Sequence, residues 1–241
     1  MDEKAHGPAV PNQVAEIGEY FALGVATGPG WLRFEDLLAP DVLAALVGAT
    51  RRAMARFSRS APEEVPARAA ASSLQLAMAA RLISPVIGSV AALQRVPLLT
   101  ADVLCWSADH HSVRFAVSAL SWQQHDDAGE AARCVAATLL DSVLAELIDR
   151  MHTASGLSPK IMWGNVISAA NGAVTVLGSA RPALVPAGRR LVGALAGTGP
   201  LRDTAVTDGP TFRRRTCCLY YQVPGGGLCG DCVLQTSARS H

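Results

Sequence analysis

Apolar side chains recur at every third or fourth position along much of the chain, which predicts a mainly helical protein. The clearest stripe runs from Ala132 to Met151, and its width is typical of a helix in a protein core. Asp126-Asp127 before this stripe suit a helix cap, and Gly156 after it suits a helix exit. We therefore expect a buried helix through this region.

Prolines and acidic residues mark where other helices begin. One helix is expected from Pro40, because proline suits the first helical position. Another is expected from Pro62, and its alanine-rich sequence continues to about Ser84, before Pro85 kinks or restarts it. These positions predict two helices in the first third of the chain.

The second half of the chain carries two more helical patterns. Ser158-Pro159 supplies a cap and a first helical residue, and apolar side chains follow at helical spacing. A short helix is expected at 187–195. We expect a loop at 178–186 and a polar connection without regular structure at 201–210.

The apolar period changes to two between Leu98 and His125. Side chains alternate on both sides of the polar run 109–112, which predicts two strands joined by a turn. His110 and His111 lie in that run with no third ligand at a recognisable spacing. We therefore interpret them as turn residues rather than as a metal site.

The composition fits a folded protein that does not bind nucleic acid. Of 241 residues, 50% are hydrophobic and 17% are charged, and the formal charge of +1 attracts no polyanion. The amino-terminal sequence lacks the pattern of a signal peptide, so we expect a cytoplasmic protein. The apolar stretch from Ala69 to Leu93 contains Arg81 and is interpreted as a buried or amphipathic helix. Peripheral membrane contact stays open but is not predicted.

Four of the six cysteines form the motif C-C-x10-C-x-x-C near the end of the sequence: Cys217, Cys218, Cys229 and Cys232. A Pro-Gly-Gly-Gly run at 224–227 lets the chain reverse between the two pairs. Gathered thiolates suit a soft-ligand metal site. The other two cysteines, Cys105 and Cys134, lie in apolar sequence and are interpreted as ordinary core residues.

The adjacent pair Cys217-Cys218 bears on which metal is bound. Neighbouring cysteines are an awkward pair of ligands for one tetrahedral zinc ion. A [2Fe–2S] cluster relaxes this problem, because four thiolates divide between two irons. Neither the plant-type nor the bacterial ferredoxin spacing is present. The geometry favours iron–sulfur over zinc modestly, so both stay open at this point.

This cysteine motif, with tyrosines after its first pair and Gly-Asp inside its last, resembles that of the FhuF-like ferric-siderophore reductases. The resemblance implies that all four cysteines hold one [2Fe–2S] cluster. A second, less specific resemblance lies upstream, where Trp163-Gly164-Asn165 is similar to the Trp-Gly-Asn segment of the same family. The main domain of that family is related to the carboxy-terminal part of siderophore synthetases.

Five residues outside the cysteines are candidates for the cluster environment or for contact with a substrate or partner. Arg213, Arg214 and Arg215 come just before the first cysteine pair, where cations would stabilise a cluster charge of about −2 and raise its reduction potential. They would equally attract an acidic ferredoxin or an anionic chelate, or lie solvated on a loop. Trp163 is expected in the core on its spacing, and Asn165 either binds a ligand or faces solvent.

The resemblance implies an oxidoreductase that reduces a ferric siderophore by one electron and releases the iron as Fe(II). Ferrous iron binds the hard oxygen ligands of siderophores far more weakly than ferric iron does. The sequence carries no dinucleotide fingerprint, so we expect a ferredoxin-type donor rather than direct use of NAD(P)H. No residue discriminates among siderophore types.

Two other functions stay open on the sequence. The first is an iron–sulfur electron carrier or redox sensor without a chelate substrate. The second is a structural zinc-binding protein whose thiolates fasten the carboxy-terminal segment.

The expected fold class is mainly α (α+β). We expect a helical domain at 1–210 with a small antiparallel β element. A cysteine-rich cluster-binding segment should follow at 211–241.

Overall fold

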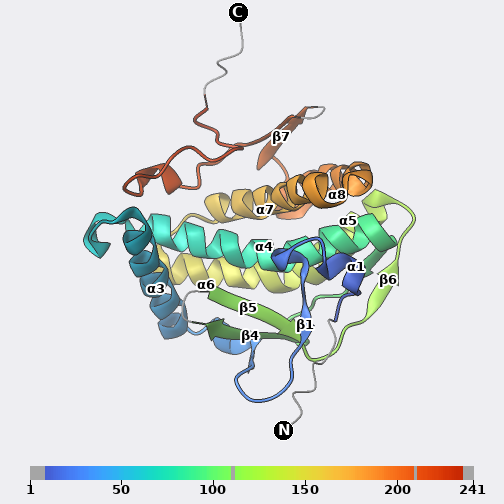
Figure 1. The fold of residues 1–241 in the computed structure, drawn as a ribbon, viewed down its shortest axis with the longest axis horizontal. Helices are drawn as coiled ribbons and strands as arrows, with labels where there is room; N and C mark the ends of the chain where they lie inside the picture. Colours follow the sequence, from blue (N-terminus) through green and yellow to red (C-terminus); the bar gives the residue numbers. More distant parts are fainter. Residues whose placement is uncertain (1–8, 110–111, 209–210, 236–241) are drawn as a thin grey trace, which may run out of the picture.

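A computed structural model describes residues 9–109, 112–208 and 211–235. Its helices form the middle of the molecule, a small sheet lies on one side, and the cysteine-rich segment crosses the opposite side (Figure 1). The predicted fold class is therefore confirmed: the protein is mainly α, with small β elements and a cysteine-rich carboxy-terminal segment.

Two helices form the centre of the fold, α4 (Ala67–Leu93) and α7 (Pro159–Ala180), and they pack along each other. Helix α4 is apolar around most of its circumference, as expected for a helix buried on all sides. It also continues through Pro85, so a restart of the helix at this residue is wrong. Packing of the buried residues around Pro85 holds the helical path although proline removes one backbone hydrogen bond.

The other helices surround this pair. Their bounds are α1 Asn12–Ala15, α2 Phe34–Leu37, α3 Pro40–Ser58, α5 Ala128–Val135, α6 Ala145–Ser155 and α8 Val185–Ala196. A π-helical stretch, η3, covers Ala136–Leu144, and 3-10 turns cover Glu19–Phe21 (η1), Pro62–Glu64 (η2), Pro182–Leu184 (η4), Gly199–Leu201 (η5) and Tyr220–Gln222 (η6).

The predicted buried helix at 132–151 is confirmed as the continuous run α5–η3–α6. Its cap is Asp127, whose carboxylate accepts the backbone N–H groups of Gly129 and Glu130 at 2.8 and 3.0 Å. Gly156 ends the run in the left-handed conformation. The π-helical middle was not predicted, because the wider turn leaves the apolar stripe intact.

The predicted pair of strands is confirmed by β4 (Leu104–Asp109) and β5 (Ser112–Val117), which pair antiparallel. They form a four-stranded sheet with β1 (Gly24–Val25), parallel to β5, and β2 (Leu32–Arg33), antiparallel to β4. A separate pair joins β3 (Arg95–Pro97) to β6 (Trp122–Gln124). His110 and His111 lie outside the described residues.

Two expected connections are wrong. Helix α7 extends to Ala180, and the 3-10 turn η4 leads directly into α8, so 178–186 is mostly helical. The segment at 201–210 contains strand β7 (Ala205–Asp208), which pairs antiparallel with β8 (Thr211–Arg214). This hairpin escaped prediction because its side chains are mostly exposed and leave no alternating apolar pattern. The division of the chain into 1–210 and 211–241 stays a prediction.

Helices α4 and α7 are long and apolar enough to cross a membrane on length and composition alone. In the structure, 61% and 56% of their most apolar windows are buried inside the protein. Core helices pass the same test, which agrees with the interpretation of 69–93 as a buried helix.

Candidate functional site

The cysteine segment, residues 211–235, begins with strand β8 and lies over α4 and α7 (Figure 1). Its main apolar anchor is Val223, which is buried in a small cluster with Ala55, Val65, Ala69 and Ala70. This cluster is separate from the main core of the helices. Beyond Val223, the segment packs on the helices through two partly buried apolar side chains, Phe212 and Leu219.

Gly164 on α7 is where the segment approaches the helix most closely. A Cβ atom at this position would overlap Thr216 Oγ1 and lie 3.3 Å from Thr216 Cβ. Thr216 immediately precedes the cysteine pair. The glycine therefore gives the backbone of α7 room to receive the start of the cysteine motif.

A tight reversal brings the second cysteine pair back towards the first. Gly225 adopts a left-handed φ of 68°, and the Gly226 N–H donates to the Val223 carbonyl at 2.7 Å. A side chain on Gly226 would overlap the carbonyl oxygens of Tyr220 and Val223. The predicted role of the Pro-Gly-Gly-Gly run is thus confirmed, and it places Cys229 Sγ 3.7 Å from Cys218 Sγ.

Backbone amides point at two of the sulfur atoms in the same way. The Leu219 N–H donates to Cys217 Sγ, and the Leu234 N–H donates to Cys232 Sγ, each at 3.4 Å. Leu219 takes a left-handed φ of 66°, a conformation that costs a residue with a side chain about 1–2 kcal/mol. Such local strain is typical of functional sites, and N–H donors to sulfur tune the potential of iron–sulfur clusters.

The donor set fits an iron–sulfur group. Two thiolates on one tetrahedral ion with metal–sulfur bonds of about 2.3 Å lie about 3.8 Å apart, and the 3.7 Å between Cys218 and Cys229 matches this separation. Within the described part of the chain, no three His, Cys, Asp or Glu side chains converge as ligands of a single ion. Thiolates divided between two irons remain compatible with this arrangement.

Burial raises the pKa of two of these thiols, Cys217 and Cys229. It raises the pKa of Cys229 to about 12, and the neighbouring Arg214 guanidinium reverses only part of this shift. Burial also raises the pKa of Cys217, and the thiols of Cys218 and Cys232 raise it further. Bound metal supplies the positive charge that such thiols need in order to lose their protons.

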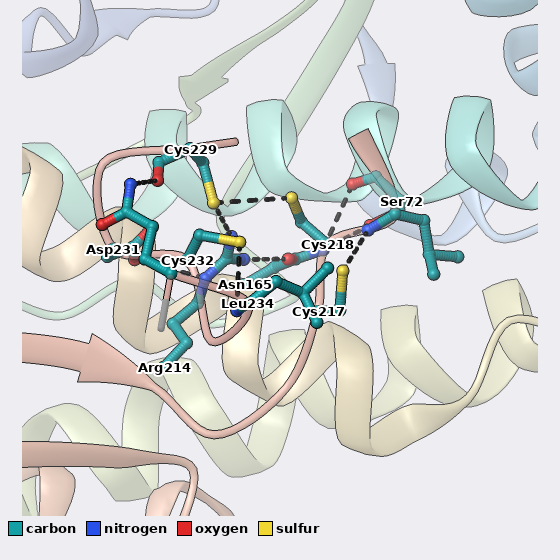
Figure 2. A network of polar contacts seen from close by, with 11 residues as sticks. Ser72, Asn165, Arg214, Cys217, Cys218, Cys229, Asp231, Cys232 and Leu234 are labelled. Carbon is teal, nitrogen blue, oxygen red and sulfur yellow. Dashed lines mark hydrogen bonds and ion pairs between the residues drawn. The ribbon is translucent and has the colours of Figure 1, made fainter. Parts of the chain in front are cut away.

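The three arginines occupy different environments. Arg214 is buried, whereas Arg213 and Arg215 are exposed on either side of it, as the alternation of a strand requires. Arg214 donates from Nη2 to Cys229 Sγ at 2.8 Å and from Nη1 to Asn165 Oδ1 at 2.8 Å (Figure 2). Its Nε lies 3.2 Å from Asp231 Oδ2, an ion pair outside hydrogen-bond angles. Of the alternatives that the sequence left open, solvation on a loop is wrong for Arg214.

Asn165 does not face solvent, so that alternative from the sequence is wrong, while a role in binding a ligand stays a prediction. It is fully buried, and its Nδ2 donates to the Ser72 carbonyl, Ser72 Oγ and Gln75 Oε1 at 3.2, 3.0 and 3.0 Å. Trp163 is half-buried against the core, in line with its helical spacing.

A cavity of about 340 Å³ lies between α4, α7 and the cysteine segment. Cys218 and Cys229 line it together with small side chains of α4 and two tyrosines, Tyr20 and Tyr220. A larger hollow of about 700 Å³ lies further along α7 and is lined by polar residues, including Asn171 and Arg189. Only the first of these two hollows is lined by cysteines.

Sequence reasoning missed Ser72, Gln75 and Asp231. Gln75 and Ser72 lie in an apolar helix, where polar residues are informative because burial requires a hydrogen-bond partner. Asp231 lies inside the C-x-x-C pair, next to the ligand candidates. The two remaining cysteines, Cys105 and Cys134, are half-buried, and Cys134 packs against the edge of the main core.

Residues 214–234 match the model of the FhuF 2Fe-2S C-terminal domain. No curated protein matches the chain. The family match confirms the FhuF-like resemblance that the cysteine motif suggested, and the cofactor of this segment is a [2Fe–2S] cluster.

Proposed function

We propose that the protein is a cytoplasmic ferric-siderophore reductase that releases iron by one-electron reduction of the chelated Fe(III). Cys217, Cys218, Cys229 and Cys232 hold the cluster. The proposal is supported chiefly by the match of residues 214–234 to the FhuF 2Fe-2S domain, together with the approach of Cys218 Sγ to Cys229 Sγ beside α4 and α7.

The chemistry needs one electron and no hydride. When bound, the cluster supplies single electrons at a potential set by its protein surroundings. Reduction converts a hard ferric ion into a softer ferrous ion, which the hard oxygen ligands of a siderophore hold far less tightly. The chain itself must therefore bind the chelate near the cysteines and keep their sulfurs in a fixed environment.

The cavity of about 340 Å³ is the proposed site of the ferric chelate. It is favoured over the larger hollow because Cys218 and Cys229 line it, so a chelate there contacts the cluster ligands directly. Tyr20 and Tyr220 offer aromatic surface, and serine and alanine side chains of α4 leave space along one wall.

The electron donor is proposed to be a small ferredoxin-type protein. Arg213 and Arg215 are exposed beside the cysteine segment and offer positive charge to an acidic partner. Exposed apolar side chains of the same segment, among them Tyr221 and Leu228, complete a surface of mixed character.

Visible and electron paramagnetic resonance spectra of anaerobically purified protein, before and after dithionite, test the cofactor. Stopped-flow mixing of the reduced protein with ferric hydroxamate, catecholate and citrate chelates then tests the reaction, with a ferrous chelator reporting released iron. We expect a bleaching brown protein with an S = 1/2 signal, followed by rapid reoxidation by at least one chelate.

Two variants make this test specific. Cys218→Ser should lose the chromophore and the activity, while Cys105→Ser, a cysteine outside the segment, should keep both. A cluster that no ferric chelate reoxidises would make the protein an electron carrier or sensor instead. A colourless protein that binds stoichiometric zinc would contradict the proposal and support a structural zinc-binding protein instead.

A further inference from the structure

Arg214 is a fully buried charged side chain that contacts the candidate cluster ligands. Its side chain is 1% exposed, and strand β8 directs it inward while its two neighbours in sequence point outward. Its backbone is fixed as well, because its N–H donates to the Asp231 carbonyl at 3.1 Å. A charge is buried in this way only when it is paired and hydrogen-bonded, so the contacts of Arg214 explain its position.

Three groups surround the guanidinium, and each engages a different nitrogen. Nη2 donates to Cys229 Sγ, Nη1 donates to Asn165 Oδ1, and Nε lies beside the Asp231 carboxylate (Figure 2). An arginine guanidinium does not lose its proton in proteins, and the Asp231 carboxylate beside it offsets the cost of its burial. The side chain is therefore a permanent cation aimed at one sulfur.

Asn165 is fixed in the orientation that this arrangement requires. Its amide nitrogen faces three acceptors on α4, the Ser72 carbonyl, Ser72 Oγ and Gln75 Oε1. Its carbonyl oxygen must therefore point the other way, towards Arg214. Helix α4 thus determines, through Asn165 on α7, where the guanidinium lies.

We infer that Arg214 is a positioning residue that directs its charge and an N–H at Cys229 and thereby makes the cluster easier to reduce, with Asn165 holding it in place. This inference rests on the proposed assignment of Cys229 as a cluster ligand. Reduction adds one negative charge to a site that is already anionic, so a buried cation favours the reduced form. A hydrogen bond from an N–H group to a ligand sulfur also favours the reduced cluster.

A lysine would not reproduce this arrangement. Its ammonium group is a compact charge on a flexible stem, whereas the planar guanidinium reaches three partners at fixed angles. Arg214→Lys should therefore keep most of the electrostatic effect and lose the directed contacts to Asn165 and Cys229. Comparing Arg214→Gln with Arg214→Lys therefore separates the effect of the positive charge from the effect of the directed hydrogen bonds.

The test is the midpoint potential of the purified holoprotein, measured by spectroelectrochemistry together with the visible circular dichroism of the cluster. Arg214→Gln should disfavour reduction by about tenfold or more in the equilibrium constant, which is about 59 mV lower for one electron. Arg213→Gln and Arg215→Gln are matched controls with exposed charges, and high salt should abolish any small shift they cause.

Asn165→Leu tests the positioning role without altering any charge. It keeps a similar volume and removes the acceptor of Arg214, so the circular dichroism should change and the potential should fall by less than in Arg214→Gln. If Arg214→Gln fails to retain its cluster, this variant still tests whether the position of Arg214 affects the cluster potential. A potential and a spectrum identical to those of the unmodified protein would overturn the inference, as would equal shifts in Arg213→Gln and Arg214→Gln.

These measurements are independent of the chelate reaction. If ferric siderophores fail to reoxidise the protein while the potential still falls in Arg214→Gln, the proposed function fails and the inference stands. If the chelates react but the potential of Arg214→Gln is unchanged, the inference fails and the proposed function stands.

Discussion

Helices α4 and α7 and the cysteine segment at 211–235 are held by opposite kinds of interaction. The two helices bury long runs of apolar side chains in one continuous core, which includes Leu82 and Ile167. The segment has Val223 as its buried apolar anchor outside the cysteines, and its most buried large side chain is the charged Arg214. Apolar burial is non-directional, whereas hydrogen bonds to a charge require a specific geometry.

This difference indicates that the helices supply most of the stability, while the cysteine segment sets the electrostatic surroundings of the sulfurs. The helical body can tolerate changes that conserve apolar volume, since the hydrophobic effect depends mainly on buried area. The segment cannot exchange its polar partners freely, because a buried charge that loses its partner becomes costly. The body therefore provides a stable surface on which a few directed contacts place the sulfurs.

The largest expected effect comes from weakening the body itself. Leu82→Ala removes a fully buried side chain of α4 and should destabilise the protein by about 2–5 kcal/mol, the cost of lost burial and a residual cavity. Chemical denaturation followed by far-ultraviolet circular dichroism measures this loss. Leu32→Ala, at a side chain that is 49% exposed, is the matched control and should change stability little.

The cluster absorbance should be lost together with the helical signal in Leu82→Ala, since the segment docks on α4 and α7. Loss of absorbance well before the helices unfold would show that the two regions unfold independently.

A smaller effect is expected where the segment docks. Gly164→Ala places a methyl group against Thr216 and should weaken docking by about 1–3 kcal/mol through overpacking. The cluster absorbance should decay faster on exposure to a chelator, while the helical signal stays nearly constant.

Gly172→Ala on the same helix is the control for helix propensity. Among the described residues, nothing lies within 4 Å of a Cβ at Gly172, so alanine should stabilise α7 by about 0.5–1 kcal/mol. The double variant Gly164→Ala with Thr216→Gly should restore docking. An equal effect of Gly164→Ala and Gly172→Ala on cluster retention would refute the close approach as the cause.

The smallest effect should be confined to the helices, at a position far along the chain from the four motif cysteines. Asp127→Ala removes the cap of α5 and should cost about 1 kcal/mol in thermal or chemical unfolding. Asp126→Ala, at the neighbouring exposed carboxylate, should cost much less. The potential of the cluster should be unchanged in both variants, and a shifted potential would contradict the separation of the two regions.

The sequence predicted those helices and strands whose own residues show a clear apolar period. The apolar stripe predicted the run α5–η3–α6, and the change of period predicted β4 and β5. The β7–β8 hairpin carries no such signal, since its exposed side chains give no alternation between apolar and polar positions. Pro85 does not restart the helix, because the surrounding packing outweighs the local preference of proline.

By itself, the sequence placed the cofactor site in the chain: the cysteine motif indicated a metal site, its resemblance to the FhuF-like family implied a [2Fe–2S] cluster, and the reversal between its pairs follows from glycine chemistry. Only the tertiary structure distinguished Arg214 from Arg213 and Arg215 and joined it to Asn165, 49 positions away. The reason is physical. Periodicity and turn chemistry act between neighbours in the chain, whereas the partner of a buried polar group is decided by how separate helices pack.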